Sequence, residues 1–143
     1  MKRKRKNNAT SQSTKTSIKL SEILLDFAWN YAVKDQSDPM QRQHFMNVAC
    51  TAWNISLLPD EVRQKAITSF IDSMRSTSAG QAGDTNMKAL ENDINALIVW
   101  KRDHYPSIRK LVVNAELYGE GTNVGCRATS VDYDLMVKNK LAQ

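Results

Sequence analysis

The chain has 143 residues, of which 41% are hydrophobic and 24% charged, and a formal net charge of +5. This length fits one domain with a sizeable core, and no stretch approaches the roughly 20 apolar residues that a membrane-spanning helix needs. Seven of the 20 Lys and Arg residues precede residue 20, with no acid among them, so the rest of the chain is close to neutral. The basic balance therefore belongs to the N-terminal segment.

Residues 1–18 are predicted to be a disordered basic tail, and residues 19–143 a single helical domain. Asn, Ser, Thr and Gln follow the basic cluster, so the apolar core of a signal peptide is missing. Five flexible cations can neutralise phosphates, which predicts weak, salt-sensitive and non-specific nucleic-acid contacts. A solubilising tail or a nuclear localisation signal fits the same cluster, which consists of Lys2, Arg3, Lys4, Arg5 and Lys6.

The first predicted helix spans residues 20–34, with Ser21 as its N-cap. The second spans residues 39–57, because Asp38 suits an N-cap and Pro39 the first helical position. Its C-terminal part is apolar on two faces, which is typical of a helix at the centre of a core.

Pro59 ends the second helix. It is also the first residue of a predicted third helix. The short connection predicts an αα-hairpin. A fourth helix is expected over residues 86–104, after a loop of small polar residues.

The pattern changes after Pro106. Residues 111–118 and 124–129 alternate around a Gly-rich turn, which predicts a β-hairpin; a helix over residues 106–118 is the alternative. A short helix is expected over residues 131–141. The sequence thus predicts a mainly α (α+β) fold: a four-helix core with an αα-hairpin, a C-terminal β-hairpin and a short terminal helix.

No motif for catalysis, a metal or a cofactor is evident. His44 and His104 are the only histidines and form no paired-ligand spacing, while Cys50 and Cys126 have no second Cys nearby. The Gly-rich segment lacks the spacing and following helix of a dinucleotide-binding loop, which favours a turn. Pairs of acids, such as Asp132 with Asp134, are better explained by helix capping than by cation binding. No small-molecule substrate is suggested.

Three tryptophans, Trp29, Trp53 and Trp100, lie on predicted helices, two of which are apolar nearly all round. Excess apolar surface is what a partner or a second copy would cover. A well-packed core of a monomer, with Trp as filler, is the equal alternative. From the excess apolar surface we expect a cytoplasmic, non-enzymatic interaction protein, an accessory subunit or a homo-oligomer, which docks through these helix faces. The alternative is a nucleic-acid-associated protein that uses the basic tail.

Overall fold

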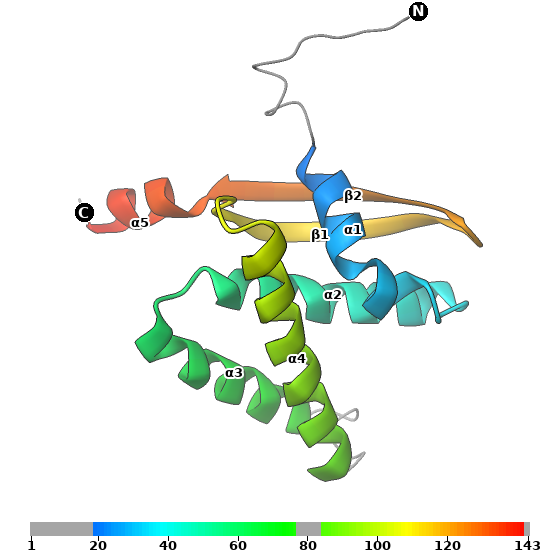
Figure 1. Cartoon of the computed structure of the whole chain (residues 1–143), viewed down its shortest axis with the longest axis horizontal. Coiled ribbons are helices and arrows are strands. Elements are labelled where there is room, and N and C mark those ends of the chain that lie inside the picture. Colours follow the sequence, from blue (N-terminus) through cyan, green and yellow to red (C-terminus); the bar gives the residue numbers. More distant parts are fainter. Residues whose placement is uncertain (1–18, 77–83, 142–143) are drawn as a thin grey trace, which may run out of the picture.

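The computed structural model describes residues 19–76 and 84–141, and the predicted basic tail lies outside them. The described elements confirm the predicted mainly α fold with a β-hairpin and a terminal helix. In chain order they are α1 (Leu20–Ala28), η2 (Trp29–Val33), α2 (Pro39–Ser56), α3 (Asp60–Arg75), α4 (Asp84–His104), β1 (Lys110–Glu120), β2 (Asn123–Asp132) and α5 (Tyr133–Leu141). Figure 1 shows β2, β1 and α2 side by side, with α1 and α4 crossing in front of this layer.

The first helical stretch is continuous but changes its winding. A π-helical turn, η2, follows α1 directly, and the N–H of Lys34 donates to the carbonyl oxygen of Trp29 five residues earlier at 2.9 Å. The predicted cap is wrong: Lys19 is the N-cap, without a side-chain bond, and Ser21 is already helical. At the other end, buried Arg42 donates to the carbonyl of Val33 at 3.2 Å, which satisfies a group at the helix C-terminus.

Helix α2 occupies the centre of the core, as predicted. Asp38 caps it by accepting from the N–H of Gln41 at 3.2 Å. Trp53 and Met46 are fully buried, and the Trp53 ring meets that of Phe27 edge-on at 5.2 Å between centroids. The α2–α3 connection is also as predicted, except that Pro59 is the N-cap of α3 because its ψ of 153° is extended rather than helical.

Helix α2 also takes the place of a third strand beside β1. The Gln43 side chain donates to the carbonyl of Ala115 at 2.8 Å and accepts from the N–H of Leu117 at 2.8 Å. The indole of Trp53 donates to the carbonyl of Lys110 at 2.8 Å. These bonds satisfy backbone groups that an isolated edge strand would leave unpaired.

The predicted hairpin is confirmed, and its turn is centred on Gly121 and Thr122. Gly119 has a φ of 91°, and an added Cβ there would collide with the carbonyl oxygen of Asn123. A bulge interrupts the alternation between Val112 and Asn114. Simple alternation would place the side chains of Val113 and Ala115 on the same face of the hairpin. Because of the bulge, Val112 is buried instead, and Val113 is 61% exposed.

Candidate functional site

The predicted interaction residues do not form one surface. Trp53 is fully buried in the core, so its side chain has no surface with which to contact a partner. Trp29 is partly buried against the same core. Trp100, also partly buried, stacks on His104 at 4.0 Å between ring centroids and packs near Phe27. Of the three, Trp29 and Trp100 keep part of their surface exposed. The predicted nucleic-acid residues Lys2, Arg3, Lys4, Arg5 and Lys6 lie outside the described residues.

The histidines and the cysteines lie in different parts of the fold, and only the two cysteines are near each other, in the core. His44 is exposed beside Phe45, and a ring nitrogen of His104 lies 2.9 Å from the carbonyl oxygen of Trp100. Cys50 and Cys126 are free thiols in the core, and burial raises the pKa of Cys50 to about 12. A thiol with so high a pKa is almost entirely protonated at neutral pH and is a poor nucleophile.

A hollow of about 660 Å³ opens where α3, α4, the start of β1 and α5 meet. Four cationic side chains line it, together with one carboxylate, Asp134. The cations come from three different elements or their flanks: Arg63, Lys101, Arg102 and Arg109. Tyr133 and several apolar residues complete the wall. The chain after its N-terminal segment is close to neutral in total, but positive charge is concentrated at this hollow.

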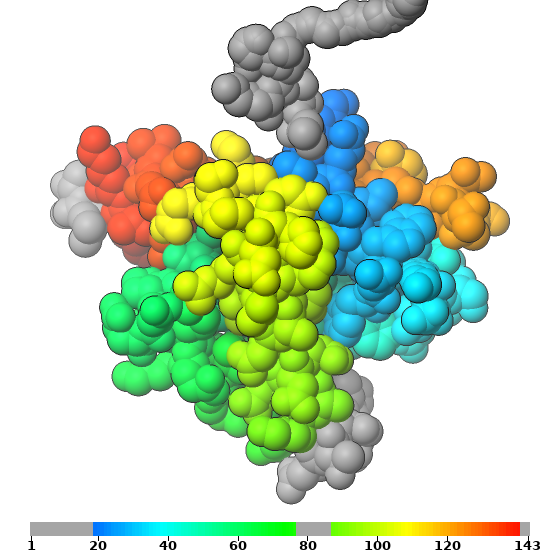
Figure 2. Space-filling view, viewed as in Figure 1, coloured from blue at the N-terminus to red at the C-terminus, as the bar shows by residue number. Residues whose placement is uncertain are grey.

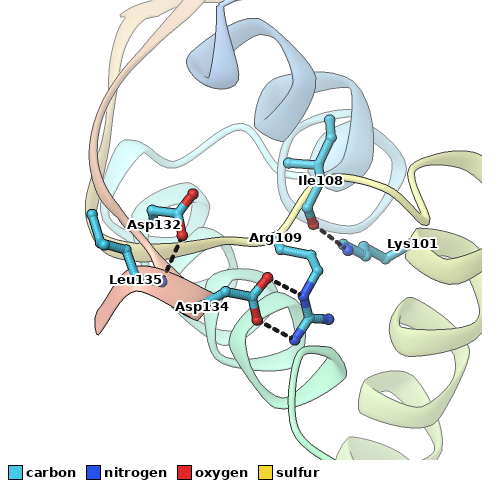
Figure 3. A network of polar contacts seen from close by, with 6 residues as sticks. All are labelled: Lys101, Ile108, Arg109, Asp132, Asp134 and Leu135. Atoms are coloured by element: carbon cyan, nitrogen blue, oxygen red, sulfur yellow. Dashed lines mark hydrogen bonds and ion pairs between the residues drawn. The ribbon is translucent and has the colours of Figure 1, made fainter. Parts of the chain in front are cut away.

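Lys101 is the most buried of these cations, with 3% of its surface exposed. Its ammonium donates to the carbonyl of Ile108 at 2.7 Å (Figure 3) and lies 4.9 Å from the centre of the Trp53 ring. Burial, followed by repulsion from Arg109 and Arg102, lowers the pKa of Lys101 to about 8. Burial and the two neighbouring cations thus all disfavour the charged form of Lys101.

Arg63 is held in place at the wall of the same hollow. Its terminal nitrogens bond to Asp60 and to the carbonyl of Leu58, the latter at 2.7 Å. Its Nε is buried and has no hydrogen-bond partner. This nitrogen has almost no exposed surface, so it lies behind the wall of the hollow rather than in it.

Arg109 connects the hollow to α5. Its guanidinium donates to both carboxylate oxygens of Asp134, at 2.8 and 3.0 Å (Figure 3). This pairing lowers the pKa of Asp134. The neighbouring Asp132 accepts from the N–H of Leu135 at 2.8 Å and so caps α5. The capping role predicted for these two acids is therefore correct for Asp132.

A second feature is an apolar surface at the α5 end of the hairpin. We define it by Val113, Val131, Leu135 and Met136, which are 61%, 40%, 55% and 36% exposed. Three of them, Val131, Leu135 and Met136, line a shared hollow of about 550 Å³. Figure 2 shows α4 across the middle of the visible face, with α5 at one end of the molecule and the hairpin turn at the other.

Neither feature was predicted from the sequence. The four cations span residues 63–109 and carry no common motif, so only the fold brings them together. The signal for the apolar surface was present in Leu135 and Met136, which a short terminal helix cannot bury on its own.

Within the described ranges, no group of three or more His, Cys, Asp or Glu residues is placed to hold a metal ion. None of the helices in those ranges has both the length and the apolar character needed to cross a membrane. Comparisons of the chain with known protein families, with curated protein sequences and with solved structures give no match.

Proposed function

We propose that this chain is a non-enzymatic interaction protein that associates through the apolar surface and the adjoining edge of β2. The observation that carries the proposal is the position of the exposed apolar side chains. Of the eight large hydrophobic residues exposed in the described chain, half make up this surface: Val113, Val131, Leu135 and Met136. Grouped exposed apolar residues are typical of interaction sites.

The two edges of the hairpin differ in whether their backbone groups have hydrogen-bond partners. Helix α2 closes the edge of β1 through Gln43. Because the carbonyl of Ala115 points outward to Gln43, Ala115 and its partner Ala128 form a non-hydrogen-bonded pair. The backbone groups of Ala128 therefore point away from β1, and no other described segment hydrogen-bonds to that edge.

A second copy of the chain is the partner that this geometry favours. Two identical strand edges can pair antiparallel about a two-fold axis, which places the same surface on both sides of the contact. The apolar surface begins on β2 and continues onto α5, so a copy aligned along β2 would also cover apolar side chains. We place this association in the cytoplasm, because Cys50 and Cys126 are free.

Light scattering across a range of concentrations tests the proposal. The wild-type chain should reach twice the mass of one chain, and Leu135→Lys should shift the equilibrium toward the monomer. Val99→Lys is the matched control, because Val99 on α4 is 58% exposed and lies outside the apolar surface. Ala128→Pro should also weaken the dimer by removing an outward N–H. A wild-type chain that stays monomeric at every concentration overturns self-association.

A further inference from the structure

We propose that the hollow lined by Arg63, Lys101, Arg102 and Arg109 is a binding site for a phosphate group. The inference is independent of self-association, since the hollow lies on the other side of Tyr133 and Asp134 from the apolar surface residues of α5. Either proposal can fail without the other.

The charge of the lining identifies the class of ligand. Four cations face one lining carboxylate, and the next acid, Asp60, is 78% exposed at its side chain and lies 4.0 Å from Arg102. A cationic hollow of this kind attracts anions. Its volume of about 660 Å³ is far larger than a single chloride requires and falls in the range of sites for small organic ligands.

The available donors point to phosphate within that class. Lys101 uses one of its three N–H donors on Ile108. Arg102 has a half-exposed side chain, and its contact with the carboxylate of Asp60 is long, at 4.0 Å. Guanidinium and ammonium groups that converge from several directions suit the oxygens of a tetrahedral phosphate.

Asp134 occupies part of this donor set. It takes two N–H groups of Arg109 and is the carboxylate of the lining. A bound phosphate would compete with Asp134 for Arg109, or would be repelled by it. The proposal therefore predicts opposite effects for removing a cation and for removing this acid.

The experiment is a titration of the full-length chain, followed by nuclear magnetic resonance, with three probes: inorganic phosphate, glucose 6-phosphate and a ten-nucleotide single-stranded DNA. Binding should move the Nε–H resonance of Arg102, whose side chain is half-exposed in the lining of the hollow. Arg102→Gln should weaken binding about five-fold, and Asp134→Asn should strengthen it. Arg127→Gln is the matched control, because Arg127 is an exposed hairpin arginine outside the hollow.

The probes separate the two sources of a phosphate group. Binding of either small phosphate with this pattern of variants identifies a free phosphate or phosphate ester as the ligand. Binding of the DNA alone with the same pattern identifies a nucleic-acid backbone. A chain with Lys2, Arg3, Lys4, Arg5 and Lys6 replaced by Gln should keep this binding. The proposal is overturned if no probe binds, or if binding is insensitive to Arg102→Gln and is lost with the tail charges.

Discussion

Asn54 of α2 and Val112 of β1 are joined by two hydrogen bonds that imitate a strand pair. The Asn54 Nδ2 donates to the Val112 carbonyl at 2.9 Å, and its Oδ1 accepts from the Val112 N–H at 2.8 Å. Val112 precedes the bulge, where the hairpin register is interrupted. A side-chain amide can supply one donor and one acceptor at this spacing, so Asn54 satisfies both backbone groups at once.

Asn54→Ala should therefore be strongly destabilising. It leaves the N–H and the carbonyl of Val112 without partners, and we expect the free energy of unfolding to fall by about 2–3 kcal/mol. Chemical denaturation measures this change. Asn92→Ala is the control, because Asn92 is exposed on α4 and Ala favours a helix. Equal stabilities for the two variants would show that water replaces the Asn54 amide without cost.

Gln43→Glu should make stability depend on pH in a defined direction. The introduced carboxyl can donate to the carbonyl of Ala115 only when it is protonated, so its folded-state pKa should lie above the unfolded value of about 4.3. The contribution of that bond is then present below pH 4.3 and is lost as the pH rises through the folded-state pKa.

At pH 7 we expect Gln43→Glu to cost about 1–2 kcal/mol, and the deficit relative to wild type should shrink toward pH 4. Thermal unfolding at several pH values measures it. Gln64→Glu, at an exposed position of α3, controls for the added negative charge. A deficit that is constant across this range would contradict the assigned role of Gln43.

These two amides illustrate what the sequence could and could not reveal. Local signals predicted the helices and the hairpin, because Asp38, Pro39 and the glycines act within a few residues of themselves. The bonds from Gln43 and Asn54 to β1 cross 58 to 74 positions and have no local signature. The bulge at Val113 was hidden for the same reason, since it is defined by pairing with β2.

The candidate sites show the same division. The charge count correctly traced the high net charge to the first 19 residues, but it gave no reason to expect a cationic hollow in a nearly neutral domain. Local concentration of charge depends on which elements meet, and Arg63 and Arg109 are 46 positions apart. The tryptophans could not be assigned from the sequence, because a large apolar side chain gives the same signal whether it packs inward, as Trp53 does, or faces solvent.

Lys101 should give the chain a rise in stability at alkaline pH. Its pKa is lowered to about 8 in the folded chain, against 10.5 for an ordinary lysine, so the unfolded chain binds this proton more tightly. The penalty for burying the charge is complete below pH 8 and is relieved as the pH rises from 8 toward 10.5. The charged or titratable groups around it are Arg63, Arg102, Arg109, Tyr133 and Asp134.

Burial also raises the pKa of Tyr31, Cys50 and Cys126, and these groups lower the stability in the same pH range. They are common to wild type and Lys101→Met, so the difference in unfolding free energy between the two chains isolates the effect of Lys101. Lys101→Met should lack the rise between pH 8 and 10.5, although it loses the bond to Ile108 at every pH. Bound phosphate should raise the pKa of Lys101 again, which appears as proton uptake on binding near pH 8. Parallel stability curves for the two chains would contradict the lowered pKa.

Asp134→Asn should loosen α5. This helix is fastened to the rest of the chain by the Arg109–Asp134 pair and by the bond from the N–H of Tyr133 to the carbonyl of Arg109 at 2.9 Å. Losing the ion pair should speed amide hydrogen exchange in α5 about two- to five-fold, while exchange in α2 stays unchanged.

In the wild type, Arg109 lowers the pKa of Asp134, so the pair is present above the ordinary carboxyl pKa of about 3.9 and is lost as the pH falls through the lowered value. Asp103→Asn, at an exposed position of α4, is the control. If α5 exchanged equally fast in both variants, the ion pair would not be what holds this helix, and the predicted gain in phosphate affinity for Asp134→Asn would have to come from removing the negative charge alone.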